Sequence, residues 1–196
     1  MARMTSARAL VLGLALIVSP AGGCAAVAAQ PPATAPTPAP DPDPEHARLA
    51  AITGRWTVTQ SLWEKPGQAP RVDHGTAHFS MVLDGRHLRQ ELHIDGPGKP
   101  FDGLGYIGYD NATGQYFSTW MDINFPGMVL AQGSFDPVSA VYTFKGSMAD
   151  AGKPGARIPL REVLHVIDDK HFTYEYYEDH GAGEALTVRL EYAREG

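Results

Sequence analysis

The chain has 196 residues, of which 16 are Lys or Arg and 22 are Asp or Glu, giving a formal net charge of -6 at pH 7. This acidic balance argues against nucleic acid as a partner, because a phosphate backbone attracts basic surfaces. The single cysteine excludes an intramolecular disulfide, so a folded domain has to be stabilised by its core alone.

The first residues have the layout of an export signal. Arg3 and Arg8 form a basic segment, residues 9–18 form an apolar run, and small residues follow. The apolar run is too short to cross a bilayer as a helix, which needs roughly 20 residues. We therefore expect an exported protein of the periplasm or cell envelope, without a transmembrane helix.

Two cleavage sites compete at the end of this signal, and they differ in the fate of Cys24. In the first, the stretch AGGC at 21–24 resembles a bacterial lipobox, so that residues 1–23 are removed and Cys24 carries the lipid. In the second, an ordinary signal peptidase removes residues 1–29 together with the cysteine. We favour the lipobox, because residues 24–44 form a Pro- and Ala-rich tether that cannot pack and would hold a domain away from a membrane.

A short helix and a long series of strands follow the tether. Asp43, Pro44 and Glu45 have the order of a helix cap, a first-turn proline and a first-turn acid, which predicts a helix over 44–52. Short alternating segments bounded by turn residues then predict ten strands, at about 54–64, 71–83, 86–95, 101–110, 115–122, 127–135, 140–148, 157–168, 171–179 and 184–194. Antiparallel strands in sequence order are most stable as a closed barrel. The prediction is an all-β fold, an antiparallel up-and-down barrel over residues 45–196 with the helix plugging one end.

The second predicted hairpin fixes its own register. Asp84-Gly85 is a strong two-residue turn, so paired residues should have numbers that sum to 169. Phe79 then faces Gln90, and the apolar side chains of both strands share one face. A slip of one residue would bury the charges of the other face, so this register is strongly specified.

The predicted connections differ in length. Those after the second, fourth, sixth and eighth strands are tight, whereas those after the first, third, fifth, seventh and ninth are longer and rich in Gly and Pro. Alternate connections of an up-and-down barrel lie at opposite ends, so all the long loops should surround one mouth. The helix then plugs the other end beside Trp56, which we expect to have a structural role.

Several segments resemble a known family. The tripeptide Gly54-Arg55-Trp56 is similar to the opening of lipocalin-type barrels, and the segments LDGRHLRQEL, PFDGLGYIGYDNATGQYFSTWMD and REVLHVIDDKHFTYEYYE resemble the domain-of-unknown-function family 1579 of the calycin superfamily. The resemblance extends from Leu49 to Tyr192 and is most specific over 103–122. It implies a calycin-like β-barrel and brings no established activity. More remotely, such barrels are similar to fatty-acid-binding proteins, lipocalins and haem-binding nitrobindins, which is a likeness of fold alone.

Alternation along the strands also assigns the interior. Leu186, Val188, Leu190 and Tyr192 of the last strand are expected to point inward together. Aromatic walls with a few polar groups are typical of a ligand cavity. The candidate cavity residues are Gln60, Gln90, Tyr106, Trp120, Arg161, Tyr174 and Tyr176. In the alternative interpretation the barrel is filled by its side chains, with Arg161 paired to Glu162 or Glu175.

The histidines do not form a metal motif. His74 and His78 are four apart on one predicted strand, hence about 13 Å apart at roughly 3.3 Å per residue, which is too far to share an ion. We expect them to pair with Asp95 and Glu91 instead. No metal or cofactor is expected, with haem held by His165, His171 or His180 as the alternative. The sequence contains no Gly-x-Ser-x-Gly motif and no cysteine after position 24, so a nucleophilic enzyme is not favoured.

We therefore expect non-catalytic binding of a small hydrophobic or amphipathic molecule at the loop-rich end, with contact to the membrane through the lipid alone. The second hypothesis is a filled barrel that acts as a structural or interaction module of the cell envelope. The third is a haem-binding or hydrolytic barrel enzyme. A cavity of about 300 Å³ or more among the long loops would favour the first over the second.

Overall fold

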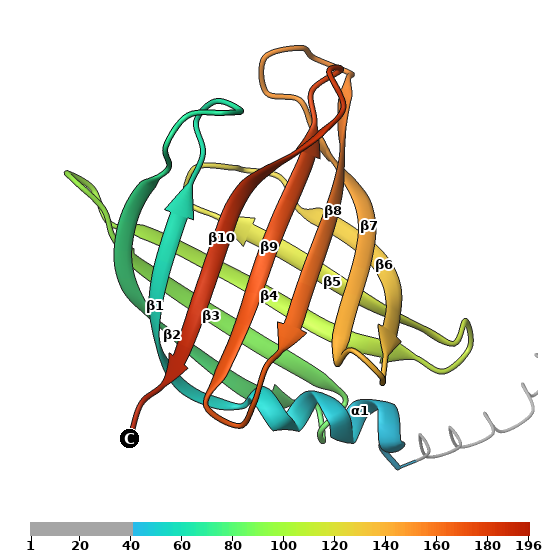
Figure 1. Ribbon diagram of the computed structural model, residues 1–196. Coiled ribbons are helices and arrows are strands. Elements are labelled where there is room, and N and C mark those ends of the chain that lie inside the picture. Colours follow the sequence, from blue (N-terminus) through green and yellow to red (C-terminus); the bar gives the residue numbers. More distant parts are fainter. Residues whose placement is uncertain (1–40) are drawn as a thin grey trace, which may run out of the picture. The chain divides into compact units, whose positions relative to one another are not determined.

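Ten antiparallel strands follow one short helix and close into a barrel, in which each strand pairs with its neighbours in sequence and the first pairs with the last (Figure 1). This computed structural model describes residues 41–196, so the predictions for the signal peptide, most of the tether and Cys24 lie outside the described residues. The helices are α1 (Pro44–Leu49) and the 3-10 turn η1 (Ala50–Ile52). The strands are β1 (Gly54–Leu62), β2 (Arg71–Val82), β3 (His87–Asp95), β4 (Phe101–Asp110), β5 (Gln115–Asp122), β6 (Val129–Asp136), β7 (Val141–Ala149), β8 (Arg157–Val166), β9 (His171–Asp179) and β10 (Glu184–Arg194). The predicted barrel is confirmed.

The β2–β3 hairpin has the predicted register. Phe79 pairs with Gln90 and Met81 with Leu88, so that the paired numbers sum to 169. The turn itself is wider than expected, because the last pair is Val82 with His87 and residues 83–86 form the connection. Three successive residues, 83–85, adopt left-handed φ values of 51°, 54° and 79°. The wider turn keeps the same sum because it removes one residue from each strand.

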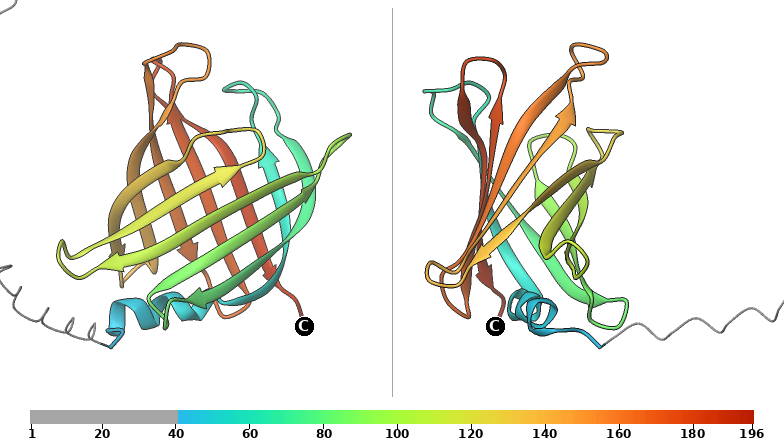
Figure 2. Two further views of the ribbon diagram at one scale, coloured as in Figure 1. Left: turned by 180° about the vertical axis from the view of Figure 1, so that it is seen from behind. Right: turned by 90° about the vertical axis from the view of Figure 1, so that its right-hand side faces the viewer.

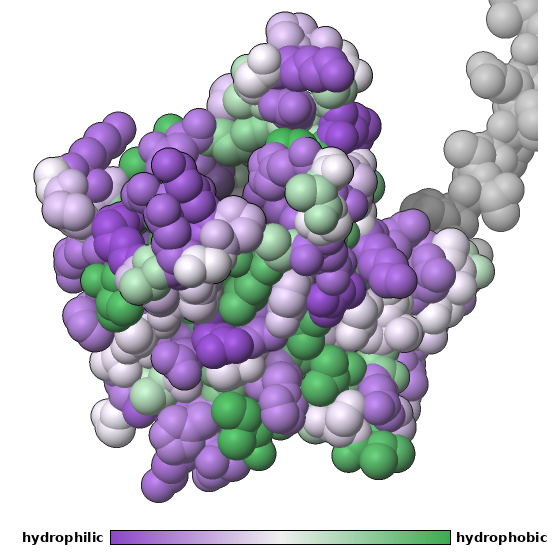
Figure 3. Space-filling view, turned by 45° about the horizontal axis from the view of Figure 1, so that its top comes forward, coloured by the Kyte–Doolittle hydropathy of each residue, from purple (hydrophilic) through white to green (hydrophobic). Residues whose placement is uncertain are grey.

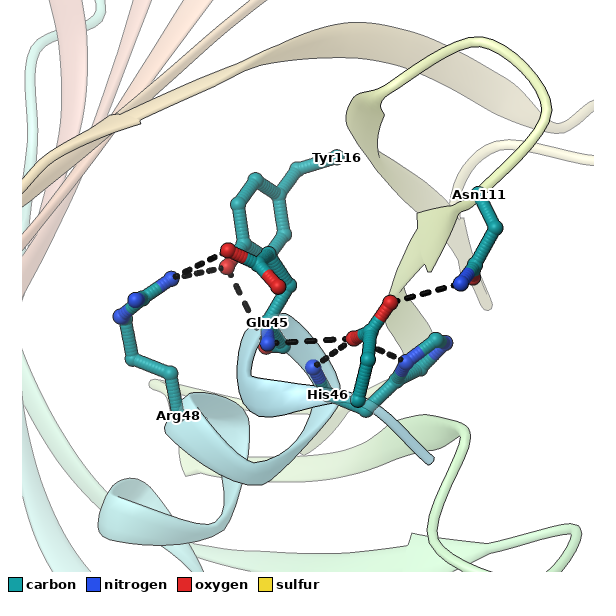
Figure 4. Close-up of polar contacts among 6 residues, drawn as sticks. Glu45, His46, Arg48, Asn111 and Tyr116 are labelled. Atoms are coloured by element: carbon teal, nitrogen blue, oxygen red, sulfur yellow. Dashed lines mark hydrogen bonds and ion pairs between the residues drawn. The ribbon is translucent and has the colours of Figure 1, made fainter. Parts of the chain in front are cut away.

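Polar contacts hold helix α1 against the closed end of the barrel (Figure 4). Asp43 caps the helix, accepting a hydrogen bond from the backbone N–H of Glu45 at 3.1 Å and another from the side chain of Asn111 at 2.6 Å. Arg48 donates to the hydroxyl of Tyr116 at 2.7 Å, and this hydroxyl donates to the carbonyl of Glu45 at 3.1 Å. Because Asn111 follows β4 and Tyr116 lies on β5, these contacts fix the helix against the barrel.

Trp56 joins the helical segment to the first strand. Its indole N–H donates to the carbonyl of Ile52 at 3.1 Å, and the guanidinium of Arg194 lies 4.1 Å from its ring centroid. Arg194 also donates to the carbonyl of Thr53 at 2.6 Å. Gly54 has a φ of 125°, and a Cβ there would lie 2.6 Å from Nη1 of Arg194. The positive φ therefore requires the glycine of the Gly-x-Trp tripeptide, and a side chain there would also displace the end of Arg194.

A β-bulge shifts the register of β10. Leu186 pairs with Tyr177, whereas Val188 pairs with Tyr176, so the strand gains one residue between these pairs. Tyr176 faces the interior, and its neighbour Tyr177 therefore faces outward. Leu186 shares the outer face with Tyr177, and the prediction that it points inward was wrong.

The closed half of the barrel is filled by aromatic side chains. Phe172 packs between Trp56 and Tyr192, with ring centroids 4.7 and 4.1 Å away, and Phe79 lies 5.5 Å from it. All four rings are almost fully buried. Figure 2 shows α1 below this end and the longer connections at the opposite end, as the loop lengths predicted, but the β9–β10 connection, residues 180–183, is no longer than those at the closed end. Between residues 41 and 196, no helix is long and apolar enough to cross a membrane.

Candidate functional site

The barrel is hollow at its loop-rich end. A cavity of about 500 Å³ opens there, and we call it the mouth cavity. Figure 3 brings this end forward and shows mainly hydrophilic side chains on the loops, with apolar ones between them. The cavity is lined by Gln60, Leu62, Arg71, Asp73, Leu92, Ile94, Gly96, Pro97, Lys99, Phe101, Trp120, Asp122, Asn124, Phe125, Val129, Met148, Leu160, Tyr176, Glu178, Val188 and Leu190. Most of its inner wall is therefore apolar, and the charged residues lie at or near the strand ends.

Trp120 forms one wall and owes its place to glycines on the neighbouring strand. Gly105 pairs with Trp120 across β4 and β5, and Gly103 pairs with Asp122. A Cβ at Gly103 would overlap the six-membered ring of the indole, and one at Gly105 would lie 3.0 Å from its Cε3 atom. The indole N–H donates to Asp122 at 3.0 Å, and Phe101 stacks on the ring at 6.4 Å between centroids. The two glycines thus let the indole lie against the barrel wall instead of filling the cavity.

Five polar side chains cross the interior between the filled half and the mouth cavity, and we call them the polar layer. Gln90 on β3 donates to the hydroxyl of Tyr192 on β10 at 3.0 Å. Ser118 on β5 and Tyr174 on β9 both donate to the same carboxylate oxygen of Glu162 on β8, at 2.6 and 2.5 Å. All five side chains are buried. Two of these hydrogen bonds join strands that are not neighbours in the sheet, β3 to β10 and β5 to β8. The bonds also satisfy polar groups whose burial without a partner would be costly.

The polar layer lies directly beneath the mouth cavity. Successive inward residues of a strand are two apart, and each member of the layer is two residues from one that lines the cavity. The lining residues in question are Leu92, Trp120, Leu160, Tyr176 and Leu190. The layer therefore forms the boundary at which the hollow part of the barrel ends.

Burial shifts the pKa values of ionisable groups in this layer. It raises the pKa of Glu162, although the hydrogen bonds from Ser118 and Tyr174 act in the opposite direction. Burial also raises the pKa of Tyr174 well above its ordinary value, and the neighbouring Glu162 carboxylate adds to this effect. Burial thus favours the neutral form of each group.

The rim of the mouth cavity contains cations and carboxylates. Nη1 of Arg71 lies 2.6 Å from Oδ2 of Asp73, whose side chain is only 7% exposed. The contact is an ion pair without hydrogen-bond geometry. Glu178 pairs with His180 at 2.8 Å. Lys99 has no carboxylate within 4 Å among residues 41–196.

Asp122 is the third carboxylate of the rim, and its oxygens are occupied. Oδ2 accepts the indole N–H of Trp120 at 3.0 Å, while Oδ1 accepts the backbone N–H groups of Asn124 and Phe125 at 2.7 and 2.9 Å. The last two bonds fix the start of the β5–β6 loop. Asp122 therefore holds both the wall and one loop of the mouth in place.

The predicted site residues fall into three groups. Gln60, Trp120 and Tyr176 line the mouth cavity. Gln90 and Tyr174 lie beneath it in the polar layer. The other two predicted residues, Tyr106 and Arg161, lie on the outer face.

The outward position of Tyr106 and Arg161 has a clear cause in each case. Tyr106 alternates with inward Gly105 and pairs with Arg89 of β3. Arg161 makes an ion pair with Glu184 at 2.6 Å and lies 3.9 Å from the ring centroid of Tyr177. The neighbouring residue Glu162 points inward instead. Neither Glu162 nor Glu175, the two partners predicted for Arg161, is its partner in the structure.

Sequence reasoning missed the charged rim. Arg71 and Asp73 precede the inward residues Ala77 and Phe79 at intervals of two along β2, and that alternation was a usable signal. Lys99 lies in the β3–β4 loop, where alternation gives no direction. Its place at the mouth depends on the loop conformation.

The histidines lie outside the mouth cavity. His165, His171 and His180 are exposed and none of them lines it. His78 approaches Glu91 at 3.5 Å, as predicted, but His74 contacts Thr59 and Asp95 pairs with His93. In the part of the chain that the structure describes, no cluster of three or more metal-ligating side chains is present.

A second hollow, of about 750 Å³, lies on the outside of the barrel over β2 to β5. It is more open than the mouth cavity, and several of its charged side chains pair with each other. Arg89 bonds Glu91 at 2.7 Å, and His93 bonds Asp102 at 2.7 Å. The mouth cavity is the better candidate because it is more enclosed and more apolar.

A closed ten-stranded up-and-down barrel with one plugged end and one hollow end defines a calycin-like β-barrel protein. The sequence profile of the family of proteins of unknown function DUF1579 matches residues 41–194, and the chain belongs to this family. The crystal structure of Rv2717c from M. tuberculosis is similar, with 16% identity and a TM-score of 0.57, over 80% of this chain and 100% of that one. A de novo designed fluorescence-activating β-barrel matches with 10% identity and a TM-score of 0.42, over 75% of this chain and 96% of that one. A comparison with curated proteins finds no significant match.

Proposed function

We propose that this protein binds a small hydrophobic or amphipathic molecule in the mouth cavity and releases it unchanged. The observation that carries the proposal is the cavity itself, about 500 Å³ with apolar inner walls and a polar rim. Cavities of roughly 300–1,000 Å³ with such linings are typical of small-molecule sites. A cavity of this size favours ligand binding over the alternative of a barrel filled along its whole length.

The test is a titration with a neutral fluorescent probe, N-phenyl-1-naphthylamine, whose emission rises in apolar surroundings. Val129→Phe adds a ring inside the cavity, because Val129 lines it and is 6% exposed. Leu130→Phe adds the same ring on the outer face of the same strand, where Leu130 is 52% exposed. Probe binding should be lost in the first variant and kept in the second. Equal binding by both would contradict the proposal, and mass spectrometry of recovered ligand checks that it is unchanged.

The proposed location is the cell envelope, with the barrel anchored through a lipid on Cys24. Support comes from the basic residues Arg3 and Arg8, the apolar run 9–18 and the small residues before the cysteine. Mass spectrometry of protein produced with its own leader and extracted from membranes tests this location. A chain that begins at Cys24 and carries acyl groups is expected, and Cys24→Ala should abolish the modification. A free chain beginning near residue 30 would contradict the anchor.

A further inference from the structure

We infer that the ligand is an amphiphile with an anionic head group, which enters the mouth cavity with its apolar end first and places its head between Arg71 and Lys99. The inference rests on the proposed function and adds the charge and the orientation of the ligand. It follows from the polarity of the cavity at two depths and from the hydrogen bonds of its charged groups.

The deep part of the cavity suits an apolar group. Val129, Leu160 and Leu190 line it and are at most 7% exposed. Beneath them the side chains of the polar layer hydrogen-bond to one another: Glu162 receives two hydrogen bonds and Gln90 donates to Tyr192. A charged head placed at this depth would lose its hydration without gaining a partner of opposite charge. The head therefore stays at the rim.

The formal charges of the rim do not by themselves select an anion. Arg71 and Lys99 contribute two positive charges, against three negative charges from Asp73, Asp122 and Glu178, which gives a sum of -1. A count of this kind treats every charge as available to a ligand. The hydrogen bonds and ion pairs decide which charges are available.

The carboxylates of the rim already have partners within the protein. Asp122 accepts three hydrogen bonds, Asp73 pairs with Arg71, and Glu178 pairs with His180. The cations have donors to spare, because a guanidinium carries five N–H groups and an ammonium three. Arg71 uses one nitrogen on Asp73, and Lys99 pairs with no carboxylate within 4 Å among the described residues.

Asp73 also places Arg71 for this role. The aspartate side chain is 7% exposed on the barrel wall, whereas that of Arg71 is 39% exposed. The carboxylate thus holds one terminal nitrogen of the guanidinium, Nη1, which leaves Nε and Nη2 to donate to a ligand. Bidentate recognition of carboxylate or phosphate oxygens is the characteristic use of such an arginine.

The experiment compares probes that share a twelve-carbon chain and differ in their head groups. Dodecanoate, dodecyl phosphate, dodecanol and dodecyltrimethylammonium, each below its micelle concentration, compete with N-phenyl-1-naphthylamine for the full-length protein. We expect the two anionic probes to compete best. The ratio of dodecanoate to dodecyl phosphate then distinguishes a fatty carboxylate from a phosphorylated lipid.

Two variants test the cations directly. Lys99→Gln should weaken dodecanoate about threefold, the effect of an exposed ion pair. The double variant Arg71→Gln with Asp73→Asn removes both members of the ion pair, so that no unpaired charge remains on the buried Asp73 side, and should weaken dodecanoate about tenfold. Neither should change the affinity for dodecanol. Lys65→Gln, in the β1–β2 loop outside the lining, is the matched control.

The outcomes separate the two proposals. If dodecanol or the ammonium probe competes as well as dodecanoate, or if the variants weaken all probes equally, the anionic inference is wrong and the cavity proposal stands. If neither the naphthylamine nor any dodecyl probe binds, both proposals are wrong. The unfolding midpoint of each variant is measured as well. A midpoint close to that of the natural protein shows that a loss of binding comes from the changed rim and not from unfolding.

Discussion

Replacing Gly103 by alanine should push Trp120 into the mouth cavity. The new Cβ would overlap the six-membered ring of the indole, which lies flat against β4 at this point. Gly103 has no left-handed φ, so alanine is compatible with the backbone and the conflict is with the ring alone. Because the β4 backbone blocks the outward direction, the indole has to turn inward.

The expected cost has two parts. Overpacking of a well-packed wall costs about 1–3 kcal/mol, and loss of the 3.0 Å bond from Trp120 to Asp122 costs about 1 kcal/mol more. The free energy of unfolding should therefore fall by about 2–4 kcal/mol. The displaced ring should also occupy the volume in which the naphthylamine probe binds.

Urea unfolding followed by circular dichroism measures the first effect, and probe titration measures the second. Gly152→Ala is the control, because its Cβ would approach only Asp150, at 3.4 Å, in the β7–β8 loop. In a Trp120→Phe background the cost of Gly103→Ala should shrink, since the smaller ring leaves room. If Gly103→Ala unfolds at the same urea concentration as the natural protein and binds the probe equally well, our account of this wall is refuted.

Three further predictions concern the closed end and the polar layer. Gly54→Ala should lower the free energy of unfolding by about 1–3 kcal/mol, because of its positive φ and the nearby Arg194, and urea unfolding would detect this loss. The raised pKa of Glu162 means that the folded state keeps this proton to higher pH than the unfolded chain, so stability should fall as pH rises above about 4.5. Glu162→Gln should flatten that fall, and equal slopes in both proteins between pH 4.5 and 8 would contradict the assignment. Asp43→Ala should speed amide hydrogen exchange in α1 without changing exchange in β9, because the cap is lost while the barrel remains closed.

The barrel could be predicted from the sequence because its signals are local and repeated. Tight turns separate alternating segments, and each hairpin pairs strands that are adjacent along the chain. Asp84-Gly85 fixed a register that the structure reproduces pair by pair. The lengths of the loops were enough to predict which end is open.

On β4 the predicted side-chain direction was wrong because a side chain from the neighbouring strand fills the interior position. On β4 the bulky residues Leu104 and Tyr106 point outward, and Gly103 and Gly105, which alternate with them, point inward, which is the reverse of what residue size suggests. The reason is Trp120 on the next strand, which needs the space above Gly103 and Gly105. Only the pairing of β4 with β5 reveals that Trp120 fills the space that side chains on β4 would otherwise occupy.

The choice between Arg161 and Glu162 follows from proton chemistry. A carboxyl can become neutral in a dry interior by taking up a proton, and Ser118 and Tyr174 supply two donors to it. A guanidinium stays charged at any accessible pH, so Arg161 faces outward and pairs with Glu184. Alternation allowed either residue to point inward, and the difference in the cost of burial decides between them.

The division of the barrel at the polar layer separates the residues that stabilise it from those that would bind a ligand. Trp56, Phe79 and Phe172 are fully or almost fully buried, and both Trp56 and Phe79 pack edge-on against Phe172 in the closed half. The rim residues Arg71 and Lys99 contribute little to that core, so changes there should alter binding while leaving the unfolding midpoint nearly constant. A barrel filled along its whole length would not permit such a separation, because every inward substitution would then disturb the same core.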